Sequence, residues 1–219
     1  MTQKVQNIIN LKIMKIKKPK IVPGKINIAR VIIILLVFTS CRKDEIVPSP
    51  TKDYLEMEYY DFANKEIKAD APGFSFDVNN DGRKDLNFAT LLVGDPIAQV
   101  DKLQFIVSTN IGVCLPVNNN ESIPCLNYGD SVLLDNFNGY QWFELSSIIL
   151  MQKIISTNSY VWEGTWKDAT HKFIPYQIKD SDKRYNGWVE ISADISTQKI
   201  ILHKAAISKT CNKIIFAGK

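Results

Sequence analysis

The sequence predicts an all-β domain, folded as an antiparallel β-sandwich or a jelly roll. Short segments rich in aromatic and β-branched residues follow one another from about residue 54 to the C-terminus, with turn-forming residues between them. None of these segments carries a long hydrophobic period of 3.6 residues, which a chain of helices would need. Successive strands without crossover helices pair antiparallel, and their alternating apolar residues then face a shared core.

The first half of this region contains four expected strands, each with apolar residues at alternate positions and a turn signal at its end. They cover residues 54–60, 73–78, 86–93 and 102–107. The second half contains six more. They cover residues 140–145, 160–166, 172–178, 187–193, 199–206 and 213–217. Segment 146–155 is apolar almost throughout, so it fits a helix or a pair of strands equally well.

An export signal precedes the predicted domain. The apolar run 31–38 follows several basic residues and is too short for the roughly 20 residues that span a bilayer as a helix. Small residues and Cys41 come next, so the segment resembles the lipobox of bacterial lipoproteins, with Phe38 where Leu is usual. The resemblance implies that residues 1–40 are removed as a signal peptide and that lipid on Cys41 anchors the protein in a membrane.

The signal also bears on the start codon, on the cellular location and on the net charge of the mature protein. Met14 gives a leader of ordinary length and is a better start than Met1. After cleavage, residues 41–53 form a tether and 54–219 the sandwich domain. The charged start 41–45 resembles tethers of lipoproteins on the outer face of the outer membrane, with the periplasm as the alternative. Segment 1–40 contains eight basic residues and no acidic ones, so the mature chain keeps 19 basic and 23 acidic residues. Because its net charge is then negative, a nucleic-acid partner is not expected.

A loop between two expected strands has the pattern of a calcium site. Oxygen-bearing side chains stand at positions 1, 3, 5 and 9 of a loop that begins at residue 77, and Gly82 at position 6 permits a tight turn. Position 12, where an EF-hand places a bidentate Glu, holds Phe88. We expect Ca²⁺ to be bound by the side chains of Asp77, Asn79, Asp81 and Asp85 and by the carbonyl of Arg83; the alternative is an Asn-Asp-Gly turn without metal.

Three cysteines follow Cys41, which leaves one without a partner if a disulfide forms. Cys114 and Cys125 bracket a polar segment with prolines that is typical of an exposed loop. Export places them in an oxidising compartment, and their closeness favours a Cys114–Cys125 bond. A bond from either of them to Cys211 is the alternative.

The sequence contains no recognisable catalytic set. His203 lies in an alternating stretch and is expected on a strand face, while His171 lies near a turn; no nucleophile elbow, zinc-binding helix motif or phosphate-binding loop occurs. Tyr160 and Trp162 share one face of a strand and form a possible platform for a sugar. We therefore expect a calcium-stabilised binding or structural module of the cell surface, with a glycan or another surface protein as partner. The alternative is a carbohydrate-binding accessory domain or a glycan-active enzyme.

The domain also resembles a group of secreted, mostly uncharacterised bacterial β-sandwich proteins. The likeness covers roughly residues 72–218 and depends on the acidic loop inside a hairpin, on the segment 185–192 and on the late strand 199–206. It implies that Tyr185, Gly187 and Trp188 lie on a core strand, with His203 on a strand packed nearby. It implies no substrate.

Overall fold

The computed structural model describes residues 55–219. The predictions that concern the start at Met14, the signal peptide, the lipidated Cys41 and the tether fall on residues outside this range. The chain divides into two units, Met1–Thr51 and Lys52–Lys219, and only the second contains described residues. Residues 55–219 contain no helix, and hence none that could cross a bilayer.

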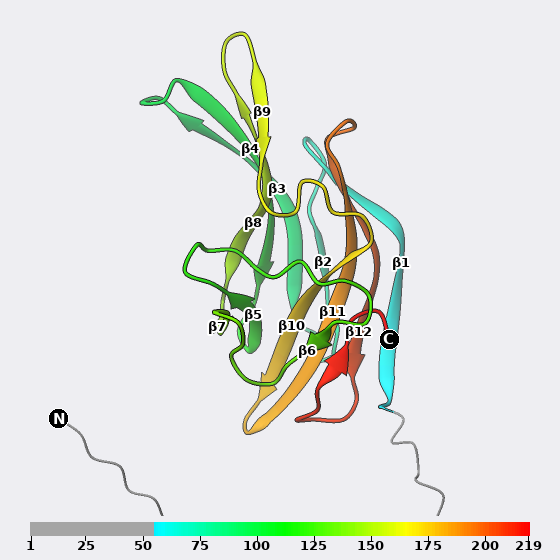
Figure 1. The fold of residues 1–219 in the computed structure, drawn as a ribbon. Helices are drawn as coiled ribbons and strands as arrows, with labels where there is room; N and C mark the ends of the chain where they lie inside the picture. Colours follow the sequence, from blue (N-terminus) through cyan, green and yellow to red (C-terminus); the bar gives the residue numbers. More distant parts are fainter. Residues whose placement is uncertain (1–54) are drawn as a thin grey trace, which may run out of the picture. The chain divides into compact units, whose positions relative to one another are not determined.

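The described residues form an antiparallel β-sandwich, as the sequence predicts (Figure 1). Thirteen strands are present: β1 Met57–Lys68, β2 Phe74–Phe76, β3 Leu86–Asp95, β4 Val100–Thr109, β5 Val113–Val117, β6 Ser131–Val132, β7 Gln141–Glu144, β8 Ser147–Ile155, β9 Tyr160–Glu163, β10 Lys172–Asp180, β11 Lys183–Asp194, β12 Lys199–Ser208 and β13 Ile215–Phe216. The larger sheet has the order β1-β12-β11-β10-β5-β7, and the other has the order β2-β3-β4-β8-β9.

Alternation of apolar residues explains why these segments are strands. In β4, Leu103, Phe105 and Val107 are buried while their neighbours are less so, and they face the core between the two sheets. The hairpins β3–β4 and β8–β9 extend together beyond the end of the larger sheet (Figure 1). Hydrophobic side chains such as Leu92 and Ile97 are exposed there.

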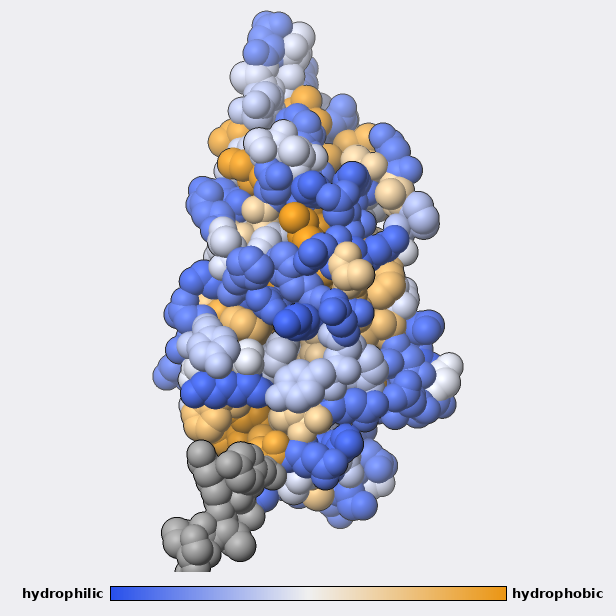
Figure 2. All heavy atoms as spheres, turned by 90° about the vertical axis from the view of Figure 1, so that its right-hand side faces the viewer, coloured by the Kyte–Doolittle hydropathy of each residue, from blue (hydrophilic) through white to orange (hydrophobic). Residues whose placement is uncertain are grey.

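A second, smaller core covers part of the outer face of the larger sheet. Strands β6 and β13 form a two-stranded sheet whose Val132 and Ile215 pack against Phe173, Trp188 and Ala206 of the larger sheet. For this reason β11 is buried on both faces around Trp188 and Val189. Elsewhere the surface is more polar: Figure 2 shows hydrophilic side chains over much of one side and a group of hydrophobic ones toward its lower end.

Two predictions about the middle of the chain need correction. Segment 146–155 is one strand, β8, and not a helix or a pair of strands. The polar loop predicted after Cys114 begins later than expected, because Val113–Val117 form the fully buried strand β5 between β10 and β7.

The predicted Cys114–Cys125 disulfide is absent, and Cys114, Cys125 and Cys211 are all free. Both members of the expected pair lie beside β10, but Cys114 stands opposite Gln177 while Leu126, next to Cys125, stands opposite Phe173. An offset of about three residues along a strand is roughly 10 Å, which is beyond the reach of a disulfide. Neither alternative bond to Cys211 is formed.

Candidate cation-binding loop and adjoining cavity

The acidic loop joins β2 to β3 at the end of the sandwich where β1 begins. Asp85 closes it, because its backbone N–H donates to the Phe76 carbonyl and its own carbonyl accepts the Asn110 N–H. Gly82 has a φ of 89° and Asn80 a φ of 57°, so the turn contains two left-handed residues. Glycine and asparagine adopt that backbone conformation more readily than other residues do.

The side chains at positions 1, 3, 5 and 9 all turn toward the loop's own backbone. Asp77 accepts the N–H groups of Asp81 (3.2 Å) and Gly82 (2.8 Å), and Asn79 Oδ1 also accepts the Asp81 N–H (3.0 Å). Asp85 Oδ2 accepts the Val78 N–H at 2.7 Å. In this structure these side-chain oxygens therefore satisfy backbone N–H groups of the loop itself.

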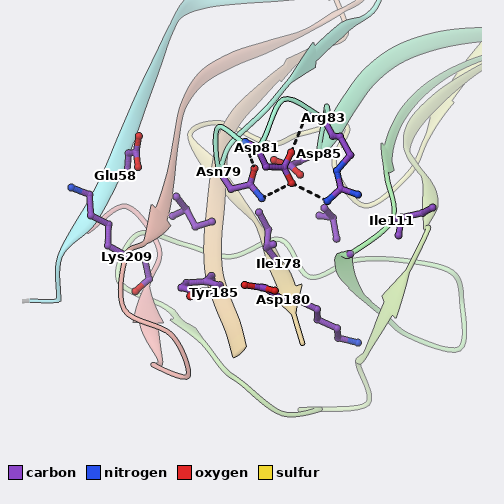
Figure 3. A pocket seen from close by; sticks show the side chains of 15 residues that line it. Glu58, Asn79, Asp81, Arg83, Asp85, Ile111, Ile178, Asp180, Tyr185 and Lys209 are labelled. Atoms are coloured by element: carbon purple, nitrogen blue, oxygen red, sulfur yellow. Dashed lines mark hydrogen bonds and ion pairs between the residues drawn. The ribbon is translucent and has the colours of Figure 1, made fainter. Parts of the chain in front are cut away.

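In this structure the Asp81 carboxylate forms an ion pair with Arg83. The Arg83 guanidinium lies 3.0 Å from Asp81 Oδ2, and the Asn79 amide donates to the same oxygen at 3.2 Å (Figure 3). The backbone N–H and the guanidinium of Arg83 lower the pKa of Asp81 and keep it ionised. With the loop in this arrangement, no three His, Cys, Asp or Glu side chains within residues 55–219 converge closely enough to hold a metal.

Asp85 is a buried carboxylate whose environment disfavours its charge. It is only 4% exposed, and desolvation raises its pKa, with further contributions from the charges of Asp77 and Asp81. A buried carboxylate close to two others is a group that a bound cation would stabilise. The carboxylate and amide oxygens of the loop are therefore of the kind that Ca²⁺ prefers. The ion pair between Asp81 and Arg83 would have to break before these oxygens could surround an ion.

Residues of β1 that the sequence pattern did not single out hold the loop in place. Tyr60 Oη donates to the Val78 carbonyl at 2.6 Å, and the Asn80 amide reaches Tyr60 Oη (3.1 Å) and Glu58 (3.2 Å). Burial and the neighbouring Glu58 raise the pKa of Tyr60 to about 12. The phenol is therefore neutral and donates this hydrogen bond throughout the ordinary pH range.

A cavity of about 410 Å³ adjoins the loop. Asn79, Asp81 and Asp85 form one wall, while the other walls come from β1, the β4–β5 connection, the end of β10 with the start of β11, and the end of β12. Charged groups of both signs, including Glu58, Lys209 and Asp180, surround an apolar patch formed by isoleucines and Tyr185 (Figure 3). These walls are far apart in the sequence, so no local pattern could have revealed the cavity.

The predicted aromatic platform does not form one exposed surface. Tyr160 is 63% exposed on the edge strand β9, but Trp162 is partly buried and packs against Phe105, with ring centroids 6.1 Å apart. The Lys153 ammonium lies over the Tyr160 ring at 4.3 Å from its centroid. Of the two rings, Tyr160 alone is well placed to meet a ligand.

Two of the segments behind the resemblance, 185–192 and 199–206, lie on two neighbouring strands of the larger sheet. Gly187 and Trp188 are buried on β11, and His203 lies on the adjacent strand β12. Comparisons of this chain with protein-family models, with curated proteins and with solved structures found no match to any of them.

Proposed function

We propose that this chain is a lipid-anchored, extracytoplasmic binding module that takes Ca²⁺ in the 77–85 loop and a small polar ligand in the cavity beside it. Asp85 carries the proposal, because it closes the loop through its backbone, its buried carboxylate accepts the Val78 N–H, and the residue also lines the cavity. A cation that neutralises Asp85 would stabilise the conformation of the loop and of the cavity wall that the loop forms. Ligand binding would thereby depend on calcium.

In the calcium-bound form, Asp77, Asn79, Asp81 and Asp85 would bind through side-chain oxygens and Arg83 through its carbonyl. In this structure the Arg83 guanidinium forms an ion pair with the Asp81 carboxylate. Calcium and this guanidinium would therefore compete for one carboxylate. The competition is weak, since an exposed ion pair contributes little. A divalent ion held by several oxygens would displace it.

Calorimetric titration and thermal unfolding of the full-length protein in detergent test the calcium proposal. With a dissociation constant of about 10⁻⁴ M and about 10 mM Ca²⁺, mass action adds about 2.7 kcal/mol to the free energy of unfolding, or about 5–10 °C in Tm. Asp81→Asn should lose most of this increment. Asp70→Asn is the matched control, because Asp70 is exposed in a neighbouring turn with a φ of 64° that Asn accepts. An unchanged parent Tm with calcium would rule the site out.

Arg83→Gln separates the roles of the Arg83 backbone and side chain. The substitution keeps the carbonyl ligand and removes the competing guanidinium, so calcium should bind more tightly than to the parent. The same titration measures the change. Equal or weaker binding would mean that the guanidinium does not compete for Asp81.

The anchor has its own test. Cys41→Ala should abolish palmitate labelling and leave unprocessed precursor in the membrane, because lipid transfer to this cysteine precedes cleavage in the lipoproteins that the signal resembles. Efficient cleavage of the variant at the same site would point to an ordinary secretory signal. The predicted location, the outer membrane facing the cell surface or alternatively the periplasm, is tested by protease access in intact cells.

The alternative function is carbohydrate binding. The exposed ring of Tyr160 on an edge strand favours it, although Lys153 covers one face of that ring. A glycan array probed with and without calcium separates the two proposals. Binding lost in Tyr160→Ala but retained in Asp81→Asn would favour the aromatic site, whereas the reverse result would favour the cavity.

A further inference from the structure

A hydrogen-bonded set of polar side chains lies on the outer face of the larger sheet, away from the acidic loop. Ser192 Oγ is 2.8 Å from His203 Nε2, and His203 Nδ1 is 2.7 Å from Asn64 Oδ1. The His171 ring stacks on His203 with centroids 4.4 Å apart, and His171 Nδ1 is 2.7 Å from Glu190. Ser192, His203 and Asn64 come from β11, β12 and β1, respectively. His203 and Asn64 are 139 residues apart in the sequence.

The direction of each hydrogen bond follows from the chemistry of the groups. Asn64 Oδ1 can only accept, so the proton of His203 is on Nδ1 and Nε2 is left as an acceptor. The His171 backbone N–H can only donate, and it donates to Ser192 Oγ at 2.9 Å. The hydroxyl hydrogen of Ser192 is thereby directed to His203 Nε2. This is the arrangement of a nucleophile, a general base and a residue that orients the base.

The backbone around these residues is irregular on both sides of His203. Opposite β11, His203 is the extra residue of a bulge, because Glu190 pairs with Lys204 and Ile191 with Leu202. Opposite β1, the register also shifts, because three residues, 62–64, lie between the pairs Asp61–Lys204 and Lys65–Leu202 while His203 alone lies between their partners. β-Bulges re-aim side chains, and here they place His203 between Ser192 and Asn64.

Non-glycine residues with left-handed backbone gather at the same place. Ala63, Asn64 and His171 have φ values of 51°, 57° and 49°. This conformation is less costly for asparagine than for alanine or histidine, and nine other non-glycine residues among the described ones also adopt it. Here Ala63 and Asn64 lie in the bulge of β1, and His171 directly precedes β10.

His203 also has the protonation state that a base needs. Desolvation and the neighbouring His171 lower the pKa of His203, with Lys204 acting in the same direction and Glu190 opposing them. The ring is therefore neutral at pH 7. Ser192 and His203 are half-buried and Asn64 is exposed, so solvent and a small substrate can reach the set.

We propose that Ser192, His203 and Asn64 form a site for acyl transfer from carboxylic esters. Ser192 is the nucleophile, His203 the general base and Asn64 the positioning residue. The proposal is independent of calcium binding by the 77–85 loop, because the two sites share no residue. Either can fail while the other stands.

The reaction needs only an ester and water. Ser192 Oγ bonds to the ester carbonyl carbon while its proton passes to His203 Nε2, and the tetrahedral adduct then releases the alcohol, which takes that proton. A water molecule attacks the acyl-serine with His203 again as base. The carboxylic acid leaves and the Ser192 hydroxyl is restored. Asn64 accepts from Nδ1–H throughout and keeps the ring in the required tautomer.

An active-site label tests the proposal on the unmodified full-length protein. A fluorophosphonate probe reacts with activated serines, and tandem mass spectrometry of the labelled parent protein should place the adduct on Ser192. This result does not depend on whether any variant folds. An adduct on another serine, or none after prolonged incubation at pH 8, would overturn the proposal.

Variants then separate catalysis from structure. Ser192→Ala should abolish labelling and any hydrolysis of p-nitrophenyl acetate, while Ser156→Ala, at a surface serine bonded to Ser159 and not to a histidine, should change neither. His203→Gln should slow labelling at least about 100-fold. Far-UV circular dichroism confirms that each variant is folded. Unchanged labelling in folded His203→Gln would contradict the role of this histidine.

Asn64 needs a readout that a structural role would not affect. Asn64→Gly suits the left-handed backbone and removes the acceptor, so labelling should slow. Asn64→Asp also tolerates that conformation and should restore the rate. Its negative charge should raise the pKa of His203 and move the pH–rate profile of labelling, which increases through that pKa, to higher pH. If the profiles of parent and Asn64→Asp coincide, Asn64 does not orient the base.

Discussion

At the scale of single residues, the contact between Tyr176 and Gly187 shows why one position on a central strand must lack a side chain. The two residues are paired across β10 and β11, and the fully buried Tyr176 ring reaches over Gly187 to donate to the Ala206 carbonyl on β12 at 3.0 Å. A Cβ on Gly187 would lie 2.2 Å from Tyr176 Cζ and 2.6 Å from that carbonyl oxygen. Gly187 is required for space and not for its backbone angles.

Gly187→Ala should therefore destabilise the domain strongly. Because neither the buried ring nor the backbone of β12 can move easily, we expect a loss of about 3 kcal/mol in the free energy of unfolding, at the upper end of the range for overpacked cores. Urea denaturation measures it. Gly94→Ala is the matched control on β3, since its nearest neighbouring atom would be 3.5 Å away. Equal effects of the two substitutions would show that Tyr176 does not enforce the glycine.

At the scale of elements, the structure explains which parts of the fold could be predicted. The hairpin β3–β4 and strands β10, β11 and β12 were predicted because their alternation is long and their turns are marked. Strand β5 was missed because all five of its residues are buried, so it has no alternation, and Pro116 suggests a loop. Strand β6 was also missed, because its two residues are too few for any period, whereas β13 lies inside the strand predicted at 213–217.

Two of the free cysteines are shielded from solvent. Cys114 is fully buried within a strand and Cys125 is half-buried, and desolvation raises the pKa of both thiols. We expect iodoacetamide to modify Cys114 only after denaturation, without any reductant. Peptide mapping under nonreducing conditions checks this directly. A peptide that links Cys114 to Cys125 would contradict the structure.

At the scale of the whole molecule, the candidate sites arise from contacts between distant strands. The acidic loop could be located from the sequence, since its candidate ligands lie within nine residues, and calcium binding by this loop stays a prediction. The cavity could not, since its walls come from five separate parts of the chain. The set around His203 could not either: the two bulges that bring Asn64 and Ser192 to His203 leave no periodic signal.

The free energy of unfolding of the whole domain should depend on the ionisation of the buried Asp85 carboxylate. In calcium-free buffer the folded-state pKa of Asp85 is raised, so folding favours the protonated form. This group therefore reduces stability at neutral pH, and the reduction disappears as the pH falls through the raised pKa toward the ordinary value near 4.

Asp85→Asn isolates that contribution, because the amide oxygen can still accept the Val78 N–H but carries no charge. Without calcium, we expect the variant to be more stable than the parent at pH 7, with a difference that shrinks as the pH is lowered to 4. In 10 mM calcium the order should reverse, since the variant loses an anionic ligand. Urea denaturation of both proteins between pH 4 and 8, with and without calcium, measures the four curves. A difference that is independent of both pH and calcium would mean that Asp85 is only a hydrogen-bond acceptor in a turn.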